Sequence, residues 1–196
     1  MKTIMRRLCF GLVALLILLV TGCTFKSEYR EMVEENLASG IRQDSIFLGI
    51  YFGMDSKEFY RYCWEMNKKQ LFLNGPSNNS VQYDISDKLK HPGKMNFYPS
   101  FYEDKIYEMP VEFAYDAFSW QDTYGVDSLL TDVLGMYEDW YGPFKEFTHP
   151  EKGSVFVNIN GNRQIRLFKN NLNNSVNAVF TDLTVDKPKE NKEKES

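Results

Sequence analysis

Cysteine and histidine are the residue types that would first indicate catalysis or metal binding in this chain. Its 196 residues include three cysteines and two histidines. Cys9 and Cys23 lie in or directly after an apolar N-terminal stretch, which leaves Cys63 without a partner for an intramolecular disulfide. A catalytic cysteine needs a histidine to activate it, but His91 and His149 each precede a proline in a polar stretch that predicts a loop. A structural metal site needs several such ligands at close spacing, so the sequence predicts no metal, no cofactor and no catalytic residue.

Cys63 itself lies in a segment with the pattern of a short amphipathic helix. The run DSKE at 55–58 is a capping box, in which Asp55 is the N-cap and Glu58 the N3 residue. Apolar residues then recur at the spacing of one helical face, and free cysteine usually behaves as a small buried hydrophobe. We therefore expect Cys63 to pack in the core, and the alternative is a reactive thiol. The expected apolar face contains Phe59, Tyr62, Cys63 and Met66.

Carboxylates gather after residue 121, where a pair could carry out the general acid–base chemistry that glycosidases use. Asp132 and Glu138 do not share a helical face well, and Asp127 is expected to cap a helix. The sequence also lacks a Gly-rich phosphate loop, a Gly-x-Ser-x-Gly elbow and zinc or calcium signatures. These observations predict that the protein is not an enzyme. The acidic residues in question are Asp122, Asp127, Asp132, Glu138 and Asp139.

The N-terminus has the pattern of a targeting segment. Three basic residues precede an apolar run at 8–20, which is shorter than the roughly 20 residues that a permanent transmembrane helix needs. The run VTGC at 20–23 resembles the lipobox of bacterial lipoproteins. The resemblance implies a signal peptide at 1–22, cleavage before Cys23, and acylation of Cys23 by chains such as palmitate. The alternative is an ordinary secretory signal followed by an unrelated cysteine.

A lipidated cysteine places the protein in the cell envelope, with the membrane as a partner through Cys23. Several acyl chains hold a protein at a bilayer far more firmly than one chain does. Thr24 is not the aspartate-type signal that retains lipoproteins at the inner membrane, so the outer membrane is favoured. Whether the body faces the periplasm or the cell surface stays open. The formal charge of −4 becomes about −7 once the basic signal is removed, which argues against nucleic acid as a partner.

The remaining chain predicts an α+β fold of two similar helix-plus-antiparallel-sheet units packed together, preceded by the signal peptide and a short helix. Residues 23–43 are assigned to the lipid anchor and a spacer helix. The first unit is expected at 44–124 and the second at 125–185. The tail at 186–196 is highly charged and lacks the apolar residues that a core needs, so we expect it to be disordered.

Both units are expected to run in the same order, from a helix into antiparallel strands. Asp-Ser begins each helix, His-Pro occurs at matching places, and Asn160-Gly161 predicts a type I′ hairpin. An internal duplication explains this order, and a single α+β domain with two helices on one sheet is the alternative. The expected helices are 56–69 and 128–141, the latter capped by Asp127; an extended segment is expected at 44–54, and strands at 81–85, 95–101, 105–115, 154–159, 162–168 and 176–183.

Aromatic side chains make up 15% of the chain and crowd between residues 97 and 147. Because neighbours in a strand point to opposite faces, they cannot all enter one core. Either another unit or the N-terminal helix covers the remainder, or they form an exposed patch that docks a protein or a sugar. Trp120, in the polar loop SWQDTYG, is the best single anchor. The candidate partner-binding residues are Trp120, Tyr98, Tyr102 and Tyr124.

The run GMDSKE at 53–58 carries a family resemblance. A lipobox, this turn into a short helix and the antiparallel strands that follow resemble the small lipoproteins of the outer-membrane assembly machinery. They also resemble the β-lactamase inhibitor protein family, which uses tandem helix-plus-sheet units, and lipoproteins of unknown role in Bacteroidota. The match covers a small part of the chain, and Asn74-Gly75-Pro76 departs from the Gly-x-Pro that usually follows the helix. The resemblance implies a fold but transfers no binding or catalytic residue.

These observations together predict a non-enzymatic, membrane-anchored lipoprotein that acts as a protein-interaction module in the cell envelope. The alternative is an envelope binding module that takes a glycan or small molecule on an aromatic sheet face.

Overall fold

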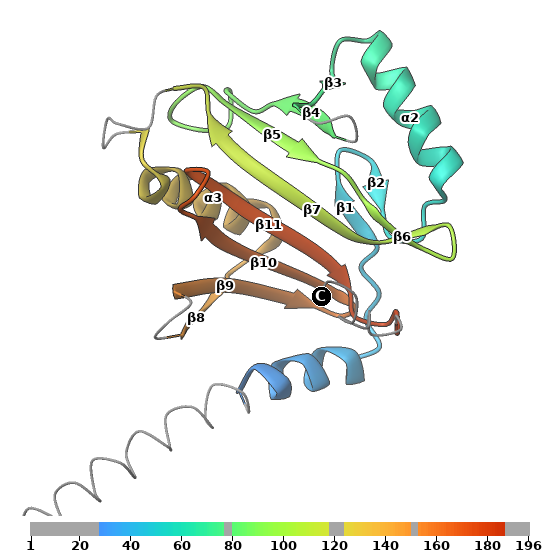
Figure 1. The fold of residues 1–196 in the computed structure, drawn as a ribbon. Helices are drawn as coiled ribbons and strands as arrows, with labels where there is room; N and C mark the ends of the chain where they lie inside the picture. The colour runs from blue at the N-terminus through green and yellow to red at the C-terminus, as the bar shows by residue number, and fades with distance from the viewer. Residues whose placement is uncertain (1–27, 77–79, 118–123, 150–152, 187–196) are drawn as a thin grey trace, which may run out of the picture.

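An antiparallel sheet runs through the whole described part of the chain (Figure 1). The computed structural model describes residues 28–76, 80–117, 124–149 and 153–186. Within these ranges the sheet has nine strands in the order β3-β4-β5-β7-β11-β10-β9-β8, with β6 paired to β7 beside this path. The α+β class predicted from the sequence is confirmed.

The sheet consists of two halves that meet at its centre. The first half follows helix α2 (Ser56–Lys68) and the second half follows helix α3 (Val126–Tyr141). In each half the strands run in chain order from the outer edge inwards, so the last strands, β7 and β11, pair at a central seam. Val111 lies opposite Ala178 on this seam. The first half contains β3 (Leu73–Asn74), β4 (Val81–Asp84), β5 (Gly93–Phe97), β6 (Ser100–Tyr102) and β7 (Lys105–Tyr115); the second contains β8 (Lys145–His149), β9 (Gly153–Asn160), β10 (Arg163–Asn170) and β11 (Ser175–Asp182).

The two helices begin differently. Asp55 caps α2 by accepting a hydrogen bond from the backbone N–H of Glu58 at 2.8 Å, which confirms the predicted N-cap. The Glu58 carboxylate accepts a hydrogen bond from the Tyr51 hydroxyl. The prediction that Asp127 caps α3 is wrong, because the N-cap is Gly125 and makes no side-chain hydrogen bond. Asp127 instead lies in the first turn, where its carboxylate accepts a hydrogen bond from Lys169 at 2.7 Å. A carboxylate in this position also interacts favourably with the positive end of the helix dipole.

Strand alternation directs one set of side chains into the core. Met109, Val111 and Phe113 of β7 are at most 3% exposed, and the residues between them point to the other face. Helix α3 lies directly on this core face and buries four side chains, whereas α2 buries only Phe59. The four α3 side chains are Leu129, Val133, Met136 and Tyr137.

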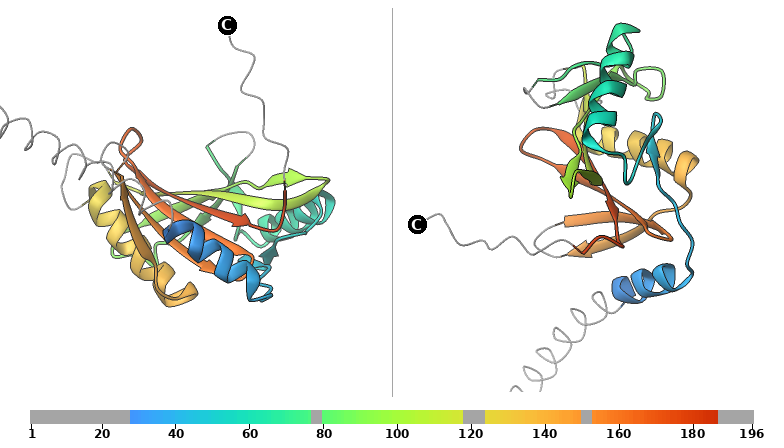
Figure 2. Two further views of the ribbon diagram at one scale, coloured as in Figure 1. Left: turned by 90° about the horizontal axis from the view of Figure 1, so that it is seen from below. Right: turned by 90° about the vertical axis from the view of Figure 1, so that its right-hand side faces the viewer.

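A short hairpin separates the two helices on the core side of the sheet. The segment 44–54, predicted to be simply extended, folds into β1 (Ser45–Phe47) and β2 (Ile50–Tyr51) with a tight turn between them. The ring of Phe47 packs edge-to-face on Phe97 of the first half and on Phe180 of the second. The right-hand view in Figure 2 shows the hairpin on the same side of the sheet as α3.

The helix at residues 28–38 packs on the opposite face of the second half. The Tyr29 ring meets Phe147 edge-to-face at 6.0 Å between centroids, and the Tyr29 hydroxyl accepts a 2.5 Å hydrogen bond from Gln164. Asn36 accepts a hydrogen bond from the backbone of Gly161. Both Phe147 and Gln164 are 3% exposed. In the described part of the chain no helix is long and apolar enough to cross a membrane.

Candidate functional site

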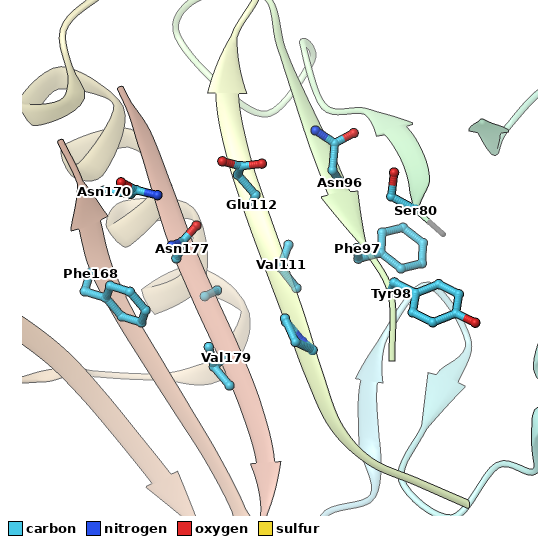
Figure 3. Close-up of a pocket in the computed structure, with 12 residues that line it drawn as sticks. Ser80, Asn96, Phe97, Tyr98, Val111, Glu112, Phe168, Asn170, Asn177 and Val179 are labelled. Atoms are coloured by element: carbon cyan, nitrogen blue, oxygen red, sulfur yellow. The ribbon is translucent and has the colours of Figure 1, made fainter. Parts of the chain in front are cut away.

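The helix at residues 28–38 packs on one face of the sheet, over the second half. On this same face, the first half of the sheet and the seam are open. A hollow of about 400 Å³ lies there, over β5, β7, β11 and β10 (Figure 3). Its lining residues come from strands far apart in the sequence, which the β7–β11 seam brings side by side. This hollow is the candidate functional site.

A row of polar side chains crosses the hollow from strand to strand. Gln82 lies opposite Asn96, Asn96 opposite Glu112, and Glu112 opposite Asn177. The Gln82 amide donates a 3.1 Å hydrogen bond to the Asn96 oxygen, and the Ser175 hydroxyl donates one of 2.8 Å to Glu112. The row therefore offers amide donors and acceptors around one carboxylate. In the described ranges Glu112 has no ion pair within 4.0 Å.

An apolar row lies beside the polar one. Pro110 of β7 is exposed and lies opposite Val179 of β11. The rings of Phe168 and Tyr98 lie on opposite sides of the hollow, as Figure 3 shows. The hydroxyls of Tyr98 and Tyr60 lie 2.6 Å apart, and this hydrogen bond, with burial, raises the pKa of Tyr98 to about 12. Tyr98 therefore stays neutral at physiological pH and can exchange hydrogen bonds with a ligand.

A half-buried arginine lies on the same face of the sheet as the hollow. Arg166 of β10 lies opposite Val179 and points to the side of Gln164 and Phe168, since alternate residues of a strand share a face. Its Nε atom is buried, and no hydrogen-bond partner exists for it among the described residues. Glu112 and Arg166 therefore place opposite charges on the two sides of the seam.

The structure does not bring the predicted partner-binding residues together. Tyr98 lines the hollow. Tyr102 packs edge-to-face on Tyr107 and lines a different hollow, beside Arg42 and Asp182. Tyr124 contacts the rings of His91 and Tyr115 near the start of α3. Trp120 and the lipidation candidate Cys23 lie outside the described residues.

Cys63 packs against the core from the inner side of α2, as expected. It is a half-buried free thiol in contact with the apolar cluster. Burial raises the pKa of the Cys63 thiol to about 11, so almost none of it is thiolate at neutral pH. This environment disfavours a nucleophilic role. Among the described residues no group of three or more His, Cys, Asp or Glu side chains could hold a metal ion.

Sequence reasoning missed the polar residues of the hollow. The alternation MPVEFAY in β7 already indicated that Glu112 points away from Val111 and Phe113. Pairing between β7 and β11 depends on tertiary structure, so no pattern in the sequence indicates that Asn177 lies beside Glu112.

Comparisons with protein-family models, with curated proteins and with solved structures give no match for this chain. The resemblance of residues 53–58 to envelope lipoproteins therefore stays a prediction. The site has to be interpreted from its own geometry and charge.

Proposed function

We propose that the protein is a lipid-anchored component of the cell envelope whose open sheet face binds another envelope protein, without catalysis. The observation that carries this proposal is the uncovered polar row from Gln82 to Asn177 across four strands. The equivalent face of the second half is partly covered by the helix at residues 28–38. The amide side chains of this row lie outside the apolar core, so they are available to hydrogen-bond with a partner.

The chemistry of the hollow favours an uncharged or basic protein loop as the occupant. Amides on neighbouring strands can pair with the peptide groups of such a loop, and hydrogen bonds to the Glu112 carboxylate are stronger than those between neutral groups. Pro110 and Val179 add apolar contact area beside the polar row. A net charge of −4 for the whole chain also favours a basic partner over an acidic one.

The proposed anchor would hold this face near a membrane. Five residue steps separate Cys23 from the first described residue of the helix at 28–38, a reach of at most about 18 Å. That helix lies on the same side of the sheet as the hollow, because Gln164 and Phe168 are on one face of β10. We therefore expect the partner to be a membrane protein or another lipoprotein.

Co-purification from gently solubilised envelopes, with a tag on the C-terminal tail, tests the proposal. We expect one stoichiometric partner, and we expect Glu112→Gln combined with Asn177→Ala to reduce its recovery at least tenfold. Glu65→Gln on the outer side of α2 is the matched control and should leave recovery unchanged. Recovery that is equal for the double variant and the control would contradict binding at this face.

A glycan is the second candidate occupant, because Phe168 and Tyr98 flank the amide row on its two sides. Aromatic rings beside amides and a carboxylate suit the apolar faces and hydroxyls of a sugar. Saturable binding of an oligosaccharide in a calorimetric titration, abolished by Phe168→Ala, together with no protein partner, would favour this function.

A further inference from the structure

A second hollow, of about 300 Å³, lies on the core side of the sheet between the β1–β2 hairpin and the end of α3. It is on the opposite side from the candidate site, since Met95 lines this hollow and its neighbour Asn96 lines the other. The floor is formed by Ile85 and Met95, which are 1% and 3% exposed. Aromatic and aliphatic groups form the walls, and no charged side chain of the described residues lines it.

The hollow exists because α2 does not occupy the position that α3 occupies in the second half. Helix α3 covers its half of the sheet with four buried side chains. In the first half the short hairpin takes part of this space, and the remainder stays open beside Trp140. Trp140 is 46% exposed and therefore presents part of its ring to the hollow and to solvent.

Three hydrogen bonds from different elements hold the hairpin in place. The Tyr141 hydroxyl donates to the carbonyl of Ile46 at 2.7 Å, and the Tyr62 hydroxyl donates to that of Leu48 at 2.5 Å. The Arg163 guanidinium donates to the carbonyl of Ser45 at 2.8 Å. A rim that is fixed before a ligand arrives lowers the entropy cost of binding.

Leu48 occupies a strained position at the tip of this rim. Its φ is +49° and that of Gly49 is +80°, which is the pattern of a type I′ turn. Such a turn favours asparagine before the glycine, and a leucine there has an unfavourable backbone conformation. The strained residue supplies an apolar wall of the hollow instead. Strain of this kind concentrates at functional sites.

We propose that this hollow binds an uncharged ring compound of about the size of indole. A dry apolar cavity of about 150 Å³ accepts benzene, so a hollow about twice as large accommodates two fused rings. The lining of Phe47, Tyr83, Trp140 and Tyr141 offers edge-to-face contacts to such rings. Because the hollow and the open sheet face are on opposite sides, this site is independent of the function proposed above.

Titration with 4-fluoroindole, followed by the ¹⁹F signal of the probe, tests this site directly. The chain from Thr24 onward contains every residue that the structure describes, and it is free of the lipid that would absorb the probe. We expect saturable broadening of the probe signal at submillimolar concentration. Indole-3-acetate, which adds a carboxylate, should compete at least tenfold more weakly because no cation lines the hollow.

Two variants and one control distinguish this site from non-specific binding. Leu48→Asn should weaken probe binding at least tenfold while raising the melting temperature by about 2–4 °C, because asparagine accepts the positive φ. Trp140→Ala should weaken binding by a similar factor. Leu172→Asn, at a residue that is 96% exposed, should change neither quantity. The proposal is overturned if the probe shows no saturable binding up to millimolar concentration, or if Leu48→Asn and Trp140→Ala bind it as the unmodified protein does.

Discussion

The two halves of the sheet share an order of elements but differ in how completely they are covered. In the second half, α3 covers one face and the helix at residues 28–38 covers part of the other, where a hollow of about 420 Å³ stays open over β8, β9 and β10. In the first half, α2 contributes one fully buried side chain, and a hairpin fills only part of the remaining space. The candidate site and the hollow beside Trp140 both lie at least partly in the first half. We therefore expect the second half to contribute more to stability and the first half to contribute more to the proposed binding.

The largest expected effect comes from removing a buried side chain of α3. Leu129→Ala should lower the free energy of unfolding by about 3 kcal/mol, because Leu129 is 1% exposed and its loss leaves a cavity. Met66→Ala on the half-buried face of α2 should cost only about 1 kcal/mol. Denaturant unfolding of both variants measures the difference. Equal losses would show that α2 and α3 stabilise the fold to the same extent.

A smaller effect is expected where α3 is joined to the first half through Asp132. This carboxylate is 4% exposed and accepts hydrogen bonds from the Tyr115 hydroxyl at 2.7 Å and from the backbone of Lys90 at 3.0 Å. Burial alone would raise the pKa of Asp132. The hydrogen bonds from Tyr115 and Lys90, with the charge of Lys90, together outweigh burial and hold the pKa below its ordinary value of 3.8.

Asp132→Asn should therefore lower the free energy of unfolding by about 2 kcal/mol at pH 7. A lowered pKa in the folded state stabilises the protein above about pH 4, and this contribution is lost as the pH falls through the lowered pKa. Urea unfolding at several pH values should accordingly show a smaller loss of stability on acidification in the variant than in the unmodified protein. Parallel pH profiles for the two proteins would show that Asp132 does not link the halves electrostatically.

The smallest effect is expected where the helix at residues 28–38 packs on the second half. Tyr29→Ala removes the ring contact with Phe147 and the hydrogen-bond acceptor of Gln164, at a cost of about 1 kcal/mol. Hydrogen exchange should become faster at residues 28–38 while the sheet amides change little. Tyr29→Phe, which keeps the ring, should show an intermediate result. If exchange accelerates equally throughout the sheet, the helix is an integral part of the fold and not a separate cover.

Local chemistry in the sequence was sufficient to predict several elements. The N-cap that Asp55 forms with the backbone of Glu58 depends only on neighbouring residues, and the helix begins where this pattern predicts. The hairpin predicted between β9 and β10 is present, but the type I′ turn predicted on Asn160-Gly161 is wrong. Asn160 pairs with Arg163, so the two-residue loop is Gly161-Asn162, and only the glycine has a positive φ. The cap of α3 was mispredicted because Asp127 has the right residue type but lies within the helix and faces Lys169.

Features that depend on distant segments could not be predicted. A proline usually marks an edge or a bulge of a sheet, yet Pro110 is in the central strand β7. The carbonyl of Pro110 accepts a hydrogen bond from the backbone of Tyr98, which lies between the end of β5 and the start of β6. The nitrogen of Pro110 points to the same side, where neither strand continues, so the sheet loses no backbone hydrogen bond there. The β1–β2 turn was also invisible, since Leu48 is not a turn-forming residue. The polar row of the candidate site depends on the seam in the same way.

The seam between β7 and β11 also determines when the sheet can finish folding during synthesis. The inner edge of β7 stays unpaired until β11 has been synthesised, because β11 is its partner on that side and the last strand of the sheet. At 5–20 residues per second, the roughly 70 residues from the end of β7 to the end of β11 require about 3–13 s of synthesis. An unpaired strand edge of eleven residues is a site for aggregation. We therefore expect the nascent first half to be prone to aggregation until the C-terminal strand arrives.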